Sequence, residues 1–428
     1  MKFVKSNNFY RKALKYIPLA SQTFSKSAMN FVKGATPLFI EKGKGAYTWD
    51  VDNNKFIDYI LGLLPIVLGH CDPDVDYSIK QQLKKGISFS LSNELECVLA
   101  QKLTKIIPSA EKVRLGKNGS DVTSAAIRLA RAYTKRDKIA LCGYHGWHDW
   151  YIGTTVRDLG VPQVEKSLVS TFNFNDLESL EKILSKDKFA AVILEPAGSV
   201  EPEKNYLSDL KKITHKHGAL LIFDEIVTGF RIDIGGAQNF YNVTPDLSCF
   251  GKAMGNGMPI AALVGRKSIM KLIEEIFYSG TFAGETLSLA ASITTIEKIK
   301  KKKVDKKIKK TGQYLIKEIN KKILKNNLED YINLSGPVWR PLIKTNDKKL
   351  KIKNLLKSLI KQELIKEGLL ISAAINLCLS HSDSDIINKT LNCWERSLRT
   401  LKQYAESPYP EKYLKGSLVE PIFKVRKI

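Results

Sequence analysis

Cysteine is scarce in this 428-residue sequence, and its pattern argues against two kinds of site. The six cysteines are scattered, and no two have the Cys-x-x-Cys spacing of a zinc or redox motif. We therefore expect reduced structural thiols, with neither disulfides nor a metal site. The sequence also lacks an N-terminal signal pattern and any apolar run near the roughly 20 residues of a membrane span. These absences predict a soluble, cytoplasmic protein with no membrane partner.

Acidic residues are fewer than basic ones: the sequence has 44 aspartates and glutamates and 68 lysines and arginines. The resulting formal net charge of +24 raises the question of nucleic-acid binding. The excess is concentrated in EKIKKKKVDKKIKK (297–310), within a stretch where apolar residues from Ile293 to Ile319 have helical spacing. No aromatic residues alternate with these lysines, and no helix-turn-helix or zinc-finger spacing is visible. We interpret the lysines as the solvent-exposed face of a helix whose other face is apolar, and we expect no nucleic-acid partner.

Short apolar runs alternate with helical patterns along the chain, which predicts an α/β fold around a mainly parallel sheet. With 43% hydrophobic residues, the chain is long enough for two or more domains. In such sheets ligands bind beyond the carboxyl ends of the strands, so the residues that follow each strand are the candidate site. The strands are predicted at 138–143, 189–196, 219–226, 246–251 and 260–265, with a helix at 206–218.

A glycine-containing turn, Asn118-Gly119-Ser120, directly precedes an amphipathic helical pattern. Free N–H groups at a helix start bind phosphate, and the Ser120 hydroxyl would add a donor. The alternative is an ordinary helix cap made by Ser120 or Asp121. The turn is neither a Gly-x-Gly-x-x-Gly motif nor a P-loop, so it does not predict a dinucleotide or nucleoside triphosphate.

The loop after the first predicted strand, GYHGWH (143–148), places an aromatic residue and histidines between glycines. Tyr144 could stack on the face of a planar ligand, although loop aromatics often fill a hydrophobic gap instead. His145 and His148 have no third ligand at a suitable spacing, so we expect no metal site.

Two charged residues stand in unusual apolar settings. Asp224 and Glu225 end the apolar run LLIFDE, where a buried carboxylate needs a cationic or proton-bearing partner. Lys252 lies within FGKAMGNGMP, and an apolar setting disfavours the charged amine and makes a lysine a better nucleophile. The alternative is a lysine that extends to water. One helix and one strand separate Asp224 from Lys252, so the two side chains could meet at adjacent strand ends.

A phosphate turn, a stacking aromatic, a buried acid and an isolated lysine together describe a pyridoxal 5'-phosphate site. In such a site the lysine binds the cofactor covalently, and the acid keeps the pyridine nitrogen protonated so that the ring can accept electrons. Lys252 and Asp224 are the residues predicted for these two catalytic roles.

The order of motifs resembles that of the class III (omega-type) aminotransferases, close to glutamate-1-semialdehyde 2,1-aminomutase. The resemblance is carried by PLFIEKGKGAYTWDVDNNKFIDY (37–59), LGHCDPDV (68–75), DEIVTGFR (224–231), TPDLSCFGKAMGNGMP (244–259) and GTFAGETLSLAA (280–291). It implies the aspartate aminotransferase fold, PLP fold type I, with a mainly parallel sheet flanked by helices and a smaller α+β C-terminal domain. The implied division is an N-terminal segment 1–62 packing with the small domain, a large PLP-binding domain 63–296 and a small domain 297–428.

The same resemblance implies a set of cofactor-binding residues. Tyr144 and Ile226 would contact the two ring faces, and Gly280 with Thr281 would complete the phosphate site of the neighbouring subunit. A homodimer with shared active sites follows from that last role. The implied set is Gly119, Ser120, Tyr144, His145, Glu195, Asp224, Ile226, Lys252, Gly280 and Thr281.

The expected substrate residue departs from the aminomutase pattern. Ser25 stands where the aminomutase has an arginine for the substrate carboxylate, with Lys26 beside it. Because serine cannot form a bidentate carboxylate clamp, we expect an aminotransferase that moves an amino group from a small-molecule donor to a separate carbonyl acceptor. A sugar intermediate of surface-polysaccharide biosynthesis is the suggested acceptor. The alternatives are a true glutamate-1-semialdehyde 2,1-aminomutase and a non-catalytic binding protein on this fold.

Overall fold

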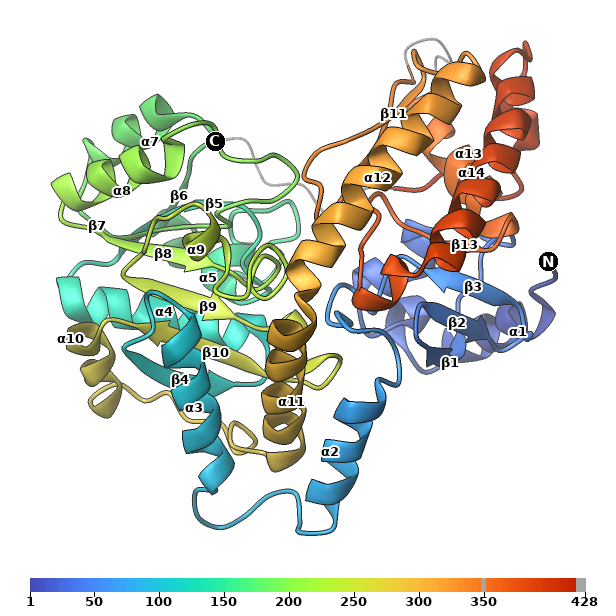
Figure 1. Cartoon of the computed structure of the whole chain (residues 1–428). Coiled ribbons are helices and arrows are strands. Elements are labelled where there is room, and N and C mark those ends of the chain that lie inside the picture. The colour runs from blue at the N-terminus through green and yellow to red at the C-terminus, as the bar shows by residue number, and fades with distance from the viewer. Residues whose placement is uncertain (348–351, 421–428) are drawn as a thin grey trace. The chain divides into compact units, whose positions relative to one another are not determined.

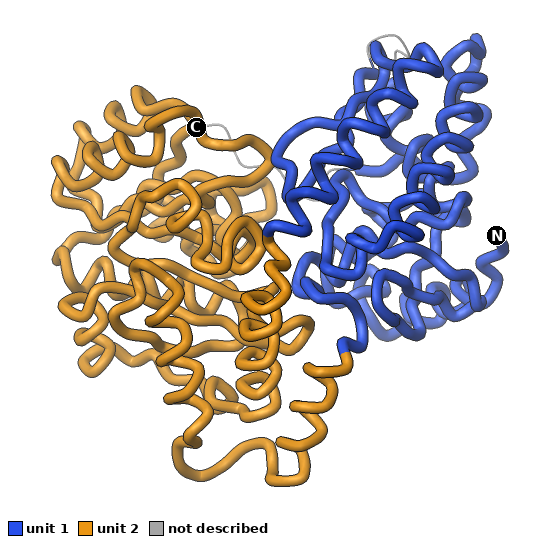
Figure 2. The backbone as a smooth tube through the Cα atoms, viewed as in Figure 1, with its two compact units in different colours: residues 1–72, 306–422 blue, residues 73–305, 423–428 orange. Residues whose placement is uncertain are grey.

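A computed structural model describes residues 1–347 and 352–420, and the chain divides into two compact units (Figure 2). In the described residues, unit 1 comprises 1–72 and 306–420, and unit 2 comprises 73–305.

Unit 2 is built on a seven-stranded sheet in the order β4-β10-β9-β8-β7-β5-β6 (Figure 1). The five strands from β9 to β6 run parallel, and β10 pairs antiparallel with both β9 and β4. The mainly parallel sheet and its five predicted strands are therefore confirmed. The strands are β4 (Lys112–Gly116), β5 (Lys138–Cys142), β6 (Val169–Thr171), β7 (Phe189–Leu194), β8 (Leu220–Asp224), β9 (Leu247–Phe250) and β10 (Ala261–Gly265).

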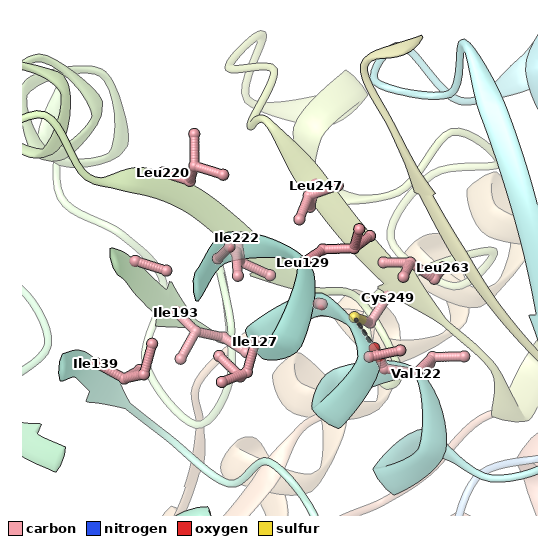
Figure 3. Close-up of a cluster of buried hydrophobic side chains, with 14 of the residues drawn as sticks. Val122, Ile127, Leu129, Ile139, Ile193, Leu220, Ile222, Leu247, Cys249 and Leu263 are labelled. Atoms are coloured by element: carbon pink, nitrogen blue, oxygen red, sulfur yellow. Dashed lines mark hydrogen bonds between the residues drawn. The ribbon is translucent and has the colours of Figure 1, made fainter. Parts of the chain in front are cut away.

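Successive side chains of the central strands pack into two different cores, because a strand alternates its faces. Ile222 of β8 joins Val122, Ile127 and Leu129 of helix α4 (Gly119–Thr134) in one core (Figure 3). Phe223 joins the other core, to which α7 (Leu177–Leu184) and α8 (Tyr206–Lys216) contribute. Because helices cover both faces of the sheet, the central strands are apolar at nearly every position. The remaining helices of the unit are α2 (Pro73–Leu83), α3 (Glu94–Ile106), α5 (Asp149–Ile152), α6 (Gln163–Ser167), α9 (Ala237–Phe240), α10 (Lys267–Met270) and α11 (Thr286–Lys302).

Unit 1 joins the two ends of the chain through a four-stranded sheet, β1-β2-β3-β13. The late strand β13 (Leu369–Leu370) pairs parallel with the early strand β3 (Lys55–Asp58), so residues more than 300 positions apart are neighbours. The other strands are β1 (Ile40–Lys44), β2 (Tyr47–Asp50), β11 (Ile332–Ser335) and β12 (Leu342–Thr345), and the helices are α1 (Val4–Ala13), α12 (Val304–Lys325), α13 (Leu355–Lys366) and α14 (Ser384–Ala405).

The lysine-rich segment is not one helix, and this part of the prediction is wrong. Helix α11 ends at Lys302, and α12 begins at Val304. Between them Lys303 has φ +51°, a left-handed conformation that ends a helix. Ile299 and Ile308 lie on different helices, and both are fully buried. The spacing looked continuous because each helix buries its own apolar face, while Lys301, Lys302 and Lys306 are exposed as expected.

All six cysteines are free thiols. Within residues 1–347 and 352–420, no cluster of three or more histidine, cysteine, aspartate or glutamate side chains is arranged to hold a metal ion. In the same ranges, no helix has the length and apolar character needed to cross a membrane.

Helix α13 carries a buried lysine, Lys361, whose side chain is almost inaccessible to solvent. Its Nζ donates hydrogen bonds to the backbone O of Asn30 at 2.9 Å and to Asn30 Oδ1 at 3.1 Å. Burial, assisted by the charge of Lys357, lowers the pKa of Lys361 from 10.5 to about 7.

This buried amine predicts a pH-dependent stability. Between about pH 7 and pH 10 the unfolded chain binds more protons at residue 361 than the folded chain, so the free energy of unfolding rises with pH. From pH 7 to pH 9, the free energy of unfolding of the wild type should rise relative to that of Lys361→Met by on the order of 1 kcal/mol per pH unit. Urea denaturation of both proteins at several pH values measures this difference, and parallel pH profiles would contradict it.

Candidate active site

Asp224 and Lys252 follow neighbouring parallel strands. Strand β8 ends at Asp224, and β9 ends two residues before Lys252. The Asp224 carboxylate is 3% exposed, and its Oδ2 lies 2.8 Å from Nδ1 of the buried His145. Its Oδ1 accepts a hydrogen bond from the Ile226 N–H at 3.1 Å. The partner that a buried acid requires is thus His145.

The imidazole of His145 is held from several sides. Its Nε2 lies 3.1 Å from the carbonyl O of Cys142, so acceptors face both ring nitrogens. Both ring nitrogens are therefore within hydrogen-bond distance of an oxygen atom. Trp150 stacks on the ring with centroids 6.2 Å apart, and Tyr151 contacts it edge-on at 5.6 Å. These contacts leave the imidazole a single orientation.

Tyr144 and Glu195 meet at the next strand ends. Glu195 Oε2 accepts a hydrogen bond from the Tyr144 N–H at 3.0 Å. Gly143 has φ +109°, and a Cβ there would lie 2.8 Å from Glu195 Oε2, so glycine is required. Burial, followed by the charge of Asp224, raises the pKa of Glu195. The Tyr144 side chain is 44% exposed and therefore does not fill a hydrophobic gap.

Burial also raises the pKa of Tyr144, and the charges of Asp224 and Glu195 add to the effect. The two carboxylates thus act on the same tyrosine, which places all three side chains in one electrostatic environment.

The turn before α4 is held by side-chain contacts. Asp121 Oδ2 accepts hydrogen bonds from the N–H groups of Lys117 and Asn118, at 3.1 and 2.8 Å. The Ser120 hydroxyl instead accepts a hydrogen bond from the Trp147 N–H at 3.2 Å. The N-cap residue is Asn118, and Asp121 completes a capping box with it, so the expected N-cap at Ser120 or Asp121 is wrong. A Cβ at Gly146, which has φ +108°, would lie 2.2 Å from Ser120 Oγ, so the backbone packs closely around this hydroxyl.

Ile226 links the α4 turn to the strand ends. A Cβ placed at Gly119 would lie 3.3 Å from the Ile226 side chain, and one at Gly251 would lie 3.1 Å from it. Ile226 therefore packs between the start of α4 and the residue that precedes Lys252.

Lys252 has a strained backbone. Its φ is +41°, in the left-handed region that non-glycine residues seldom adopt, and its side chain is half-buried. Such a conformation costs about 1–3 kcal/mol and persists where the surrounding structure imposes it, often at functional sites. This strain is an indication of function independent of the apolar sequence context.

Two groups of predicted residues line cavities whose described lining residues include neither Asp224 nor Lys252. Gly280 and Thr281 are exposed and line a cavity of about 370 Å³ with Lys117, Asp121 and Ser124, a cavity that neither Asp224 nor Lys252 lines. Ser25 belongs to unit 1 and lines a cavity there.

The sequence analysis assigned the catalytic role to Asp224, and the structure shows how the neighbouring acid Glu225 differs from it. Glu225 is fully buried and accepts hydrogen bonds from the Thr228 hydroxyl at 2.5 Å and from the N–H groups of Ala237 and Gln238 at 2.8 and 2.9 Å. It therefore ties down the start of α9 and has no part in the site. The alternation of strand faces was the signal that could have assigned the two acids to different sides. The pairing of His145 with Asp224 was also missed, since no spacing rule connects a loop residue to a strand 79 positions later.

Comparisons with known proteins identify the family of this chain. A family model described as class-III aminotransferase matches residues 29–336. A 3-aminobutyryl-CoA aminotransferase of Cloacimonas acidaminovorans is 34% identical over 415 residues, which cover 94% of this chain and 99% of that protein. A glutamate-1-semialdehyde 2,1-aminomutase of Saccharolobus islandicus is 40% identical over 324 residues, 71% of this chain and 76% of the relative. The FumI protein of Sphingopyxis sp. MTA144, solved in its PLP internal aldimine form, superposes with a TM-score of 0.86 at 25% identity, covering 95% of this chain and 99% of FumI.

Proposed function

We propose, because this chain belongs to the class III aminotransferase family, that it transfers an amino group from a small-molecule donor to a carbonyl carbon of a separate acceptor. The fold type, the enzyme class and the pyridoxal 5'-phosphate cofactor expected from the sequence are confirmed by the family match and the structural relative. The finer assignment, transfer between two molecules, rests on Ser25.

The residues at the strand ends fit this cofactor. Gly119 and Ser120 are the first two residues of α4, so their N–H groups would face a phosphate at the helix start, and Ile226 and the exposed Tyr144 would offer surfaces for the two ring faces. Asp224 would pair with the pyridine nitrogen, and Lys252 would bind the cofactor covalently. When bound, the cofactor supplies an electron sink for bonds at the amino-bearing carbon.

The protein side chains then have distinct tasks. Asp224, hydrogen-bonded to His145, would keep the proton on the pyridine nitrogen. The Lys252 amine would remove the proton from the amino-bearing carbon of the donor as a general base. With the second molecule, the protonated Lys252 would return a proton to the carbon that receives the amino group.

Ser25 favours transfer between two molecules over an internal amino shift. A substrate that keeps its carboxylate in a desolvated site needs a cationic partner, and the serine hydroxyl carries no charge. The relative that covers 94% of this chain is also named as an aminotransferase. A sugar intermediate as the acceptor is supported by the sequence pattern alone and stays a proposal, as does a cytoplasmic location.

An assay with glutamate 1-semialdehyde tests this assignment. The wild-type protein should form little or no 5-aminolevulinate, while a donor and acceptor screen followed by the cofactor's visible spectrum should reveal transfer to a separate carbonyl. Ser25→Arg should strengthen binding of a carboxylate-bearing semialdehyde by about 1.5–3 kcal/mol at best, the value of a charge-assisted hydrogen bond. If the wild-type protein formed 5-aminolevulinate efficiently without an external acceptor, its activity would be that of an aminomutase and the proposed transfer between two molecules would be rejected.

We also propose a homodimer in which Gly280 and Thr281 serve the partner's phosphate site. A cavity of about 590 Å³ beside these residues is lined by Phe89 and by Leu91, which is 86% exposed. Phe277, three residues before Gly280, is 83% exposed. Large exposed apolar side chains gathered at one place mark an interaction surface, and the role of Gly280 and Thr281 commits it to a second copy. Sedimentation equilibrium at micromolar protein should give the mass of two chains, and a monomer mass would reject the proposal.

A further inference from the structure

Residues 277–285 form a loop of unit 2 that leads into helix α11. The tip of the loop is exposed at Gly280, Thr281 and Phe282. A Cβ built at Gly280 would meet no heavy atom of the described residues within 4 Å, its own chain neighbours apart. Because the tip has so few contacts, the loop keeps one position only if its two ends are held.

Two arginines hold the first end of the loop. Arg128 Nη1, on α4, donates a hydrogen bond to the carbonyl O of Phe277 at 2.6 Å. Arg114 Nη2, on β4, donates to the carbonyl O of Tyr278 at 3.1 Å. A Cβ at Gly116 would lie 2.4 Å from the Tyr278 hydroxyl O, so this side chain also packs directly against β4. Since charged donors form stronger hydrogen bonds than neutral ones, the first end is fixed to β4 and α4.

An ion pair holds the other end of the loop. Lys117 Nζ lies 2.9 Å from Glu285 Oε2, and the two side chains are only 17% and 12% exposed. The Glu285 carboxylate also caps α11, because it accepts hydrogen bonds from the Leu287 N–H and the Ser288 hydroxyl, each at 2.6 Å. Although burial acts to raise it, the pKa of Glu285 is lowered by the hydrogen bonds from Ser288 and Lys117. Salt screens a pair that is shielded from water in this way less than it screens an exposed pair.

The three residues that hold the loop, Arg114, Lys117 and Arg128, form a basic clamp that surrounds the phosphate turn 118–120 in the sequence. Arg114 lies on the strand before the turn, Lys117 directly precedes the turn, and Arg128 lies on the helix after it. The Lys117 N–H also donates to Asp121 Oδ2 at 3.1 Å, so this residue joins the turn through its backbone and the loop through its side chain. One strand, turn and helix therefore fix both the turn and the loop.

We propose that the basic clamp consists of positioning residues for the active site of the neighbouring subunit. By holding both ends of the loop, the clamp keeps Gly280 and Thr281 where their assigned role requires them, at the partner's cofactor phosphate. This inference rests on the proposed function, from which it takes the homodimer and that role. A loop released from the clamp would lose conformational entropy each time it contacted the phosphate, so the cofactor should bind more weakly at the partner's site.

Hybrid dimers test whether the clamp acts on the other subunit. Two chains with different affinity tags are co-expressed, and one of them carries Lys252→Ala, so that borohydride labels Lys252 of the other chain alone. The measured quantity is the concentration of pyridoxal 5'-phosphate that gives half-maximal labelling. Lys117→Met on the Lys252→Ala chain should raise this concentration about tenfold or more, as expected for loss of a charge-assisted hydrogen bond. Lys117→Met on the labelled chain should leave it within about twofold of the unsubstituted hybrid, since the loop that serves that site is intact.

Two further substitutions complete the comparison. Arg128→Met should show the same dependence on which chain carries it. Lys112→Met removes an exposed lysine of β4 outside the clamp and should have no effect on either chain. If Lys117→Met weakened labelling as much or more when placed on the labelled chain, Lys117 would act on its own turn and the inference would be overturned.

Thr281→Ala on the Lys252→Ala chain separates this inference from the proposed function. If no dimer forms, or if Thr281→Ala leaves labelling unchanged in the hybrid dimer, the proposed shared site is rejected. If Thr281→Ala weakens labelling and Lys117→Met on the same chain does not, the shared site stands and the clamp alone is rejected. Weakening by both substitutions, each from the Lys252→Ala chain, supports the clamp.

Discussion

Lys252→Ala should abolish covalent attachment of the cofactor and reduce turnover by at least about 10³-fold, since both the attachment point and the general base are lost. The expectation rests on the strained φ of +41° at Lys252 and on its place two residues after β9, the strand that pairs with β8, which ends at Asp224. Borohydride reduction followed by peptide mass analysis should place a pyridoxyl group on Lys252 in wild type and on no lysine in the variant.

The chain offers many lysines for a matched control. Lys271→Ala removes an exposed lysine from the same unit and should leave both the label and the turnover unchanged. A pyridoxyl group on another lysine of the wild-type protein would show that Lys252 is wrongly assigned. Near-normal turnover of Lys252→Ala would show the same.

Asp224→Asn should keep the cofactor but lose about 10²- to 10³-fold in turnover. An amide is nearly the same size as a carboxylate, so the fold around it is preserved, but it carries no charge to hold a proton on the pyridine nitrogen. It would also leave the buried His145 without its anionic partner 2.8 Å away. Single-turnover kinetics, with cofactor content measured in parallel, separates loss of chemistry from loss of cofactor.

Glu225→Gln is the sharpest control for this variant, because it changes the neighbouring acid in the same way. Glu225 accepts hydrogen bonds from four groups, so an amide there would set its own N–H groups against N–H donors and cost about 1–3 kcal/mol of stability. The folded fraction should retain its turnover. If Asp224→Asn and Glu225→Gln lost turnover equally, Asp224 would have no special role at the cofactor.

Much of this site follows from local chemistry that the sequence displays. An apolar run that ends in a carboxylate, a glycine turn before an amphipathic pattern and a lysine among glycines each report on a strand end or a helix start. The five central strands are confirmed for the same reason, since a strand covered on both faces is apolar at every position. Local patterns failed at Lys303, where one left-handed residue divides an apparently continuous helix.

By itself, the sequence determined the α/β class, the family, the cofactor and the strand ends at which the candidate residues lie, because these depend on periodicity and on motifs read along the chain. Only the tertiary structure decided which of two adjacent acids faces His145, that Ser120 does not cap its helix, and that Lys361 holds Ser25 through Asn30. Apart from the local bond between Asn30 and Ser25, these facts depend on contacts between residues 27 to 331 positions apart. Packing sets such contacts, since a buried carboxylate or amine takes whichever partner the surrounding elements bring within hydrogen-bond distance.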